Sequence, residues 1–349
     1  MKSLNLGRYA LCSCVATAML AGCGGSQPPV GAPGAMPQRP AQQGLGVQRP
    51  AAEAQQRNGA SWLAPEAKHR DLLYVPDYNY SVVGVYSYPD AKPLGDLKVT
   101  APYGVCSDKN GNVFIASAAR GQSSVSQIFE YPHGGTTPIA TLQDPNAEPA
   151  GCAIDPSTGN LAVANVYTQG TQNGDVVVYS GATGSPVSYN VPNINQAAFC
   201  TYDASGNLYV EGANTRLETT VFGVLRKGQQ NFTNFTVNGP VSIWGLAWAR
   251  NNLVVGGYEL SSEDAAYIYQ VRVSGSSGTI VRKILVDGFR LDYGITIKDG
   301  YLLMTMDAVR IGRFYYPSGR EAGFGRHGRH GGPGGDFVPD ETISVAPRA

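Results

Sequence analysis

Short apolar runs recur along the chain at a nearly constant spacing, and most of them follow a polar turn. Five runs begin at Asn112, Asn160, Asn207, Asn252 and Tyr301, and a sixth, without the turn, begins at Leu72. Their starts lie 40, 48, 47, 45 and 49 residues apart. A repeat of this length is typical of architectures whose units bury their surfaces only against neighbouring copies. The pattern therefore predicts six similar units within residues 59–346.

The turns and the segments around them predict the fold of one unit. Three turns begin with an aspartate and end in Gly-Asn, starting at Asp108, Asp155 and Asp203. Gly and Asn tolerate the positive φ of tight hairpins, so each turn is expected to join two antiparallel strands. A third strand is expected in every unit, at 82–88, 125–131, 175–179, 221–225, 267–273 and 310–316, and a fourth in most units. Four antiparallel strands in about 45 residues predict an all-β chain that forms a six-bladed β-propeller.

Closure of the ring is predicted from the two ends of this body. The first unit begins at Asp71 without a first strand, and the alternating segment 341–346 is expected to supply it. Pairing of this C-terminal strand with blade one removes exposed sheet edges. Residues 318–337 are so rich in Gly, Arg and His that they are expected to form a flexible loop, which leaves blade six without an outer strand. The alternative is that segment 341–346 fills that outer place.

The N-terminal residues predict a targeting signal followed by a tether. A basic start is followed by a short apolar run from Tyr9 to Ala21, which is too short to span a bilayer. The run ends in Leu-Ala-Gly-Cys at residues 20–23, which resembles the lipobox of bacterial lipoproteins. That resemblance implies a signal peptide at 1–22, acylation of Cys23 and a place in the bacterial cell envelope outside the cytoplasm. Residues 23–58, rich in Pro, Gln, Gly and Ala, are expected to form a disordered tether.

The charge balance bears on the choice of partners. The 349 residues carry 26 basic and 26 acidic side chains, which gives a formal net charge of zero. A nucleic-acid partner is not expected, because neutralising phosphates requires a basic excess. The membrane, through the lipid, and a saccharide, peptide or envelope protein are the expected partners of a monomeric chain.

Three of the six cysteines lie in the predicted ring. Cys106, Cys152 and Cys200 all fall on first strands, and apolar residues occupy the equivalent positions of other units, which favours small buried thiols. Cys106 is expected on the opposite strand face from Cys152, so the two could also meet across adjacent blades in an oxidising compartment. That pairing would leave one thiol over.

The strands from Gly206 to Val210 (GNLYV) and their repeats resemble the six-bladed NHL-repeat and SMP-30/gluconolactonase-like propellers of bacterial envelopes. The resemblance covers about residues 70–346 and implies the fold more firmly than a function. In the lactonases a Glu, an Asn and an Asp hold a divalent metal on the channel axis. Glu148, Asn165 and Asp77 could supply such oxygen ligands here, although the Glu-Gly-Pro entry of that family is missing.

The mouth of the ring, where the chain enters first strands and leaves second strands, is the predicted ligand surface. Aromatic rings there can stack on apolar patches of a ligand while amides and charges orient it. The candidates are Tyr103, Arg120, Glu148, Asn195, Arg216, Trp244, Asp292 and Tyr293. No catalytic residue and no cofactor are assigned, so the expected function is a non-catalytic binding module. The alternatives are a metal-dependent lactonase-like hydrolase, with a divalent cation, and a purely structural envelope protein.

Overall fold

The computed structural model describes residues 60–118, 125–144, 147–168, 173–217, 219–238, 242–258, 266–286, 294–307, 310–326 and 342–344. The predicted signal peptide, Cys23 and the tether lie outside these ranges. Within them the chain is built of strands and two short 3-10 helices, η2 (Pro65–His69) and η3 (Ser180–Ala182). None of the described helices is long and apolar enough to cross a membrane.

The strands form six consecutive groups of antiparallel neighbours, which we call the first to the sixth unit. The first unit contains β1 (Trp62–Leu63), β2 (Leu72–Asp77), β3 (Val82–Ser87), β4 (Pro93–Lys98) and β25 (Thr342–Ser344). The second contains β5 (Pro102–Ser107), β6 (Val113–Ser117), β7 (Ser126–Tyr131) and β8 (Ala140–Asp144). The third contains β9 (Ala147–Ile154), β10 (Leu161–Thr168), β11 (Val176–Tyr179) and β12 (Val187–Tyr189).

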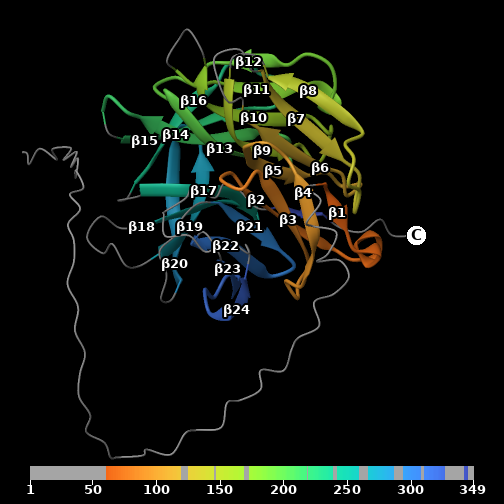
Figure 1. Ribbon diagram of the computed structural model, residues 1–349. Coiled ribbons are helices and arrows are strands. Elements are labelled where there is room, and N and C mark those ends of the chain that lie inside the picture. Colours follow the sequence, from red (N-terminus) through yellow and green to blue (C-terminus); the bar gives the residue numbers. More distant parts are fainter. Residues whose placement is uncertain are drawn as a thin grey trace, which may run out of the picture. The chain divides into compact units, whose positions relative to one another are not determined.

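The last three units follow the same order. The fourth contains β13 (Gln196–Tyr202), β14 (Leu208–Asn214), β15 (Thr219–Leu225) and β16 (Thr233–Val237). The fifth contains β17 (Ser242–Ala249), β18 (Asn252–Tyr258), β19 (Ala266–Ser274) and β20 (Ser277–Val286). The sixth contains β21 (Ile295–Lys298), β22 (Tyr301–Asp307), β23 (Arg310–Tyr315) and β24 (Glu321–Arg326). Figure 1 shows the first strands around the centre and the outer strands, such as β8, β16 and β24, at the periphery.

Hydrogen bonding joins two of the units into one sheet. The end of β16 pairs in parallel with the start of β20, through Thr236 with Ser277 and Val237 with Gly278. The fourth and fifth units therefore share an eight-stranded sheet, and the structure has five sheets rather than six separate ones. The expectation of six separate blades is wrong at this point, because the long β19–β20 hairpin extends as far as the neighbouring outer strand.

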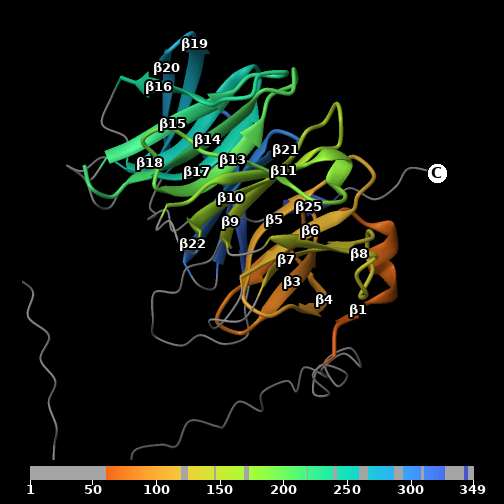
Figure 2. The ribbon, with the colours of Figure 1, turned by 90° about the horizontal axis from the view of Figure 1, so that it is seen from above.

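The C-terminal strand closes the ring. β25 pairs antiparallel with β2, with Leu72 opposite Ser344 and Tyr74 opposite Thr342. Figure 2 shows β25 near β5, the first strand of the second unit, and residues of these two strands are in contact. The Ser344 hydroxyl is fully buried and donates to the carbonyl of Gly111 in the second unit. The predicted closure of blade one by the C-terminal segment is confirmed.

The sixth unit corrects the expectation for residues 318–337. Residues Glu321–Arg326 form β24, the outer strand, with Ile311 opposite Gly325 and Gly312 opposite Phe324. Gly323 has a φ of 126°, a conformation that favours glycine. Glycine therefore permits this irregular edge strand rather than preventing it, and the C-terminal segment is not needed there. The remainder of the predicted loop, residues 327–337, lies outside the described residues.

The core lies between neighbouring units, because successive residues of a strand face opposite sides of its sheet. In β6, Val113 packs in a cluster with the first unit, whereas Phe114 packs with the third. The same alternation recurs from unit to unit, and Leu303 of the sixth unit packs against Leu73 of the first. Apolar contact with both neighbouring units explains why most residues of the second strands are hydrophobic on both faces.

The hairpin turns join antiparallel strands, as their sequence predicted. The Asp108 carboxylate accepts hydrogen bonds from the backbone N–H groups of Asn110 and Asn112, and Asp203 repeats this with Ser205 and Asn207. These bonds satisfy the turn's backbone donors, so the side chain of the first residue fixes its shape.

Candidate functional site

The predicted mouth residues that the structure describes lie at one end of the units. Tyr103 and Glu148 lie near the starts of the first strands β5 and β9, and Asn195 directly precedes β13. Arg216 follows β14, a second strand that ends where β13 begins, since Gln196 is opposite Ala213. Antiparallel pairing thus brings first-strand starts and second-strand ends together, as expected. Trp244 contributes its backbone to β17, while its side chain and all of Arg120, Asp292 and Tyr293 lie outside the described part of the chain.

Aromatic rings meet at this end. The Tyr78 ring, just after β2, lies 4.7 Å from the Tyr103 ring between centroids, in a tilted arrangement. Tyr80 in the same loop is 43% exposed, and Tyr167 near the end of β10 is 37% exposed. The described mouth therefore presents tyrosine rings from the first three units. We call Tyr78, Tyr80, Tyr103 and Tyr167 the tyrosine surface.

Polar candidates at the same end divide into two kinds. Asn195 is used internally, because its amide donates to the Thr215 hydroxyl at 2.8 Å while its oxygen accepts from the Thr215 backbone at 2.8 Å. This pair clamps the entry of β13 to the exit of β14. Glu148 is exposed and lies opposite Tyr167 in the β9–β10 ladder. Arg216 is also exposed, so these two charges face solvent at the same end of the units.

The three residues of the predicted axial metal set lie in different surroundings. Asp77 accepts a hydrogen bond from the Tyr80 backbone at 3.1 Å within its own loop. Asn165 is fully buried, and its amide donates to Asp175 at 2.8 Å. Among the described residues there is no group of three or more His, Cys, Asp or Glu side chains that could hold a metal. Asn165 thus belongs to a buried cluster that contains Asp175 of its own unit and Asp144 of the second unit.

That cluster contains two acids that sequence reasoning missed as site residues. Asp175, at the entry of β11, accepts from Asn165 and from the Ser188 hydroxyl, and it is 8% exposed. Asp144, the last residue of β8, is 1% exposed. Burial and then the Asp175 charge raise the pKa of Asp144 to about 7, against the effect of a hydrogen bond from Asn165. The two carboxylates thus sit on either side of one amide, between the second and third units.

A third buried acid lies between the fourth and fifth units. Glu211 in β14 is 4% exposed, and its Oε2 has no hydrogen-bond partner among the described residues. Burial raises the pKa of Glu211 to about 8. The equivalent positions of other second strands hold Ala116, Ala164 and Gly256, so comparison of the repeats within the sequence could have singled it out.

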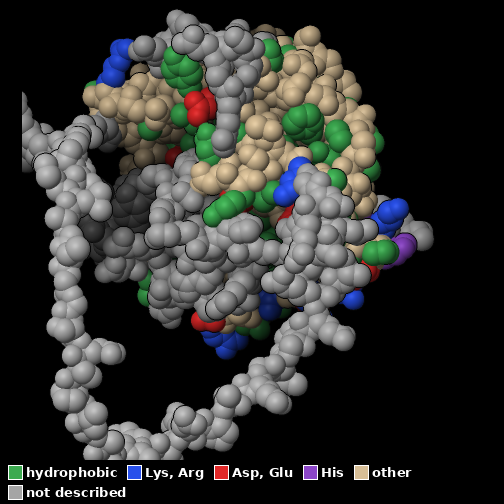
Figure 3. Space-filling model, in the orientation of Figure 1, with side chains coloured by type: hydrophobic (Ala, Val, Ile, Leu, Met, Phe, Trp, Pro, Cys, Tyr) green, Lys and Arg blue, Asp and Glu red, His purple; other side chains and the backbone are tan. Residues whose placement is uncertain are grey.

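Charged side chains do not concentrate on the face drawn in Figure 3. The described Lys and Arg side chains lie there at separate places around the rim, with Asp and Glu between them.

Comparison with solved structures agrees with this architecture. One neighbour, described as a nidogen/laminin complex, has a TM-score of 0.60 at 12% identity and covers 80% of this chain and 100% of its own. Another, a protein of unknown function from Bacteroides caccae, has a TM-score of 0.57 at 11% identity and covers 79% and 99%. The fold is that of a β-propeller. No family model matches the sequence, and no curated protein matches it. At these identities the likeness concerns the fold alone.

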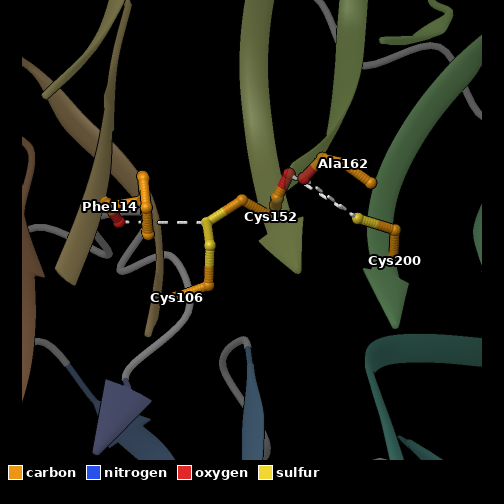
Figure 4. Close-up of a disulfide and its surroundings, with 6 residues drawn as sticks. Cys106, Phe114, Cys152, Ala162 and Cys200 are labelled. Carbon is orange, nitrogen blue, oxygen red and sulfur yellow. Dashed lines mark hydrogen bonds between the residues drawn. A yellow bond between two sulfur atoms is a disulfide. The ribbon is translucent and has the colours of Figure 1, made fainter. Parts of the chain in front are cut away.

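The propeller carries one covalent link between blades. Cys106 of β5 and Cys152 of β9 form a disulfide with their Cα atoms 5.7 Å apart, joining the first strands of the second and third units (Figure 4). Cys200 is a buried cysteine outside this disulfide, and its sulfur approaches the carbonyl oxygen of Ala162. The favoured interpretation of three buried thiols is thus wrong for two of them, and the alternative pairing across adjacent blades is the one found.

Proposed function

We propose that this chain is a lipid-anchored β-propeller of the bacterial envelope that binds a saccharide, a peptide or an envelope protein without chemical conversion. The observation that carries the proposal is the tyrosine surface at the mouth. Four rings from three units lie at the same end, and two of them contact one another. Tyrosine offers a flat apolar face with a polar tip, which suits sugar rings and extended peptides.

The neighbouring charges support recognition of a polar ligand. Exposed Glu148 lies next to Tyr167, and exposed Arg216 follows the clamp formed by Asn195 and Thr215. These groups can orient a ligand whose apolar patches stack on the rings. A solved structure with the same fold is described as a nidogen/laminin complex, which supports the inclusion of a protein partner among the candidates.

The anchor is proposed from residues 20–23 and the tether from residues 23–58. Several acyl chains on Cys23 would hold the propeller at a membrane more durably than a single chain. Expression of the full chain and of Cys23→Ala in a bacterium tests this part. We expect the wild type in the membrane fraction and the variant in the soluble extracytoplasmic fraction; equal membrane retention of both would contradict the anchor.

The binding role is tested on the purified chain with a glycan array and a peptide array. Tyr78→Ala and Tyr103→Ala are expected to lower the affinity of any wild-type ligand at least tenfold, because each removes a stacking face. Tyr315→Ala serves as the matched control, since Tyr315 is 40% exposed but lies on β23 of the sixth unit. Binding that survives both mouth variants and is lost in the control would place the ligand surface elsewhere.

A further inference from the structure

A buried polar cluster joins the second and third units. It consists of Asp144 at the end of β8, Asn165 in β10 and Asp175 directly before β11, with two hydroxyls beside them. The hydroxyls of Thr168 and Ser188 both donate to Asp175, and the Asn165 amide donates to it at 2.8 Å. This cluster shares no residue with the tyrosine surface, and the inference does not depend on the proposed function.

The cluster has more acceptors than donors. Asp144 Oδ2 and Asn165 Oδ1 have no hydrogen-bond partner within the described part of the chain, although the two residues are 1% and 0% exposed. No Lys or Arg forms an ion pair with Asp144 or Asp175 among those residues. Buried carboxylates without a positive partner are strongly unfavourable, and such sites are completed by a cation or a proton.

We propose that this cluster binds a divalent cation, Ca²⁺, that links the second and third units. Asp144 and Asp175 would supply carboxylate oxygens, and Asn165 its amide oxygen. Calcium takes six to eight oxygen ligands from carboxylates, amides and water in flexible geometry, which suits this mixed set better than the strict octahedron of Mg²⁺. Rotation of the Asn165 amide by half a turn exchanges its nitrogen and oxygen, so the orphaned Oδ1 would then point to the ion.

The positions of the ligands indicate how an ion would reach the cluster and what it would stabilise. Ser188 is exposed on β12, so the cluster reaches solvent at the outer edge of the third unit. The disulfide already fixes the inner strands of the same two units, through Cys106 and Cys152. The ion would fix their outer parts, where β8 meets the next blade. One interface would thus be held at two places.

Calcium titration of the full chain, freed of metal with EDTA and desalted, tests the proposal. Isothermal titration with CaCl₂ is expected to show one saturable site, with weaker binding of MgCl₂, and the melting temperature should rise with calcium concentration. The near-isosteric variants Asp144→Asn and Asp175→Asn are expected to weaken calcium binding at least tenfold. Glu211→Gln is the matched control, because it removes an equally buried acid at a different blade interface.

A second readout does not depend on stability. Tyr179 lies beside the cluster, since its hydroxyl donates to the Gln143 carbonyl at 2.8 Å and both aspartates raise its pKa after burial does. Terbium, a calcium substitute, should show tyrosine-sensitised emission that Tyr179→Phe lowers without changing terbium affinity. Absence of saturable binding by calcium and terbium would overturn the proposal, as would binding that is unchanged in both aspartate variants.

Discussion

Replacement of Glu211 by Gln is expected to make the protein more stable at alkaline pH. The side chain lies in β14 between Phe199 and Phe222, which are its register partners on the two neighbouring strands. Its Oε2 has no hydrogen-bond partner among the described residues, so its ionised form would be a buried and uncompensated charge. Glutamine has nearly the same shape and cannot ionise.

The size of the effect follows from proton linkage. Burial raises the pKa of Glu211 from 4.5 to about 8. Between these values the unfolded chain has released the proton while the folded chain keeps it, so stability falls as pH rises. The contribution is fully present below pH 4.5 and is lost as pH rises through about 8. The difference of about 3.5 pKa units, 8 minus 4.5, corresponds to at most about 5 kcal/mol at 1.36 kcal/mol per unit.

Urea denaturation from pH 5 to pH 9 measures this difference. Wild type and Glu211→Gln should differ little at pH 5, and the variant should be more stable by several kcal/mol at pH 9. Glu66→Gln controls for loss of one negative charge, because Glu66 is exposed on η2. Stability profiles of wild type and Glu211→Gln that run parallel across this range would refute the reasoning, since they would show that Glu211 titrates alike in both states.

Three further perturbations have expected outcomes. Replacing Cys106 and Cys152 with Ala should lower the free energy of unfolding by about 4 kcal/mol, because the unfolded chain gains the entropy of an open loop with a sequence separation of 46. In urea denaturation, a reductant should destabilise the wild type equally and leave this variant unchanged. Deletion of residues 341–349 removes β25 and its three register pairs with β2, so calorimetry should show a loss of about 3 kcal/mol or more. Asp155→Ala should destabilise the hairpin turn by about 1 kcal/mol at pH 7. Although burial opposes ionisation of Asp155, hydrogen bonds from Thr158 and Ser157 lower its pKa. The stability difference between wild type and Asp155→Ala should therefore shrink as pH falls through that pKa. A constant stability difference down to pH 3 would argue against this role of Asp155.

The architecture could be predicted because local signals recur. Each Asp-to-Asn turn encodes a hairpin by itself, and six copies at one spacing leave few folds besides a ring. Expected third strands such as 125–131 and 221–225 lie within a residue or two of β7 and β15. The strand β24 was missed because glycine content was taken to exclude it, whereas a strand at the edge needs hydrogen bonds along only one side. The pairing of β16 with β20 was missed because nothing local in either strand specifies a partner in another unit.

The site could be predicted less well than the fold. Tyr103, Glu148, Asn195 and Arg216 could be placed at one end of the blades, because antiparallel connectivity alone determines which strand ends share one side of a blade. The hydrogen-bond partners of individual side chains could not be predicted from the sequence. Asn195 clamps Thr215, and Asn165 turns to Asp175, since each choice depends on packing between neighbouring strands.

The buried acids show how far comparison of repeats within one chain can reach. Glu211 takes a place that small apolar residues occupy in the second strands before and after it, so alignment of the copies identifies it as an exception. Asp144 gives no such signal, because outer strands share little pattern and its partner Asp175 belongs to the next unit. A buried charge between blades is therefore visible in sequence only where the repeat is most regular, near the centre of the ring. Toward the rim, where outer strands differ most, polar groups that link blades have to be found from packing, and Asp144 of β8 lies in that outer zone.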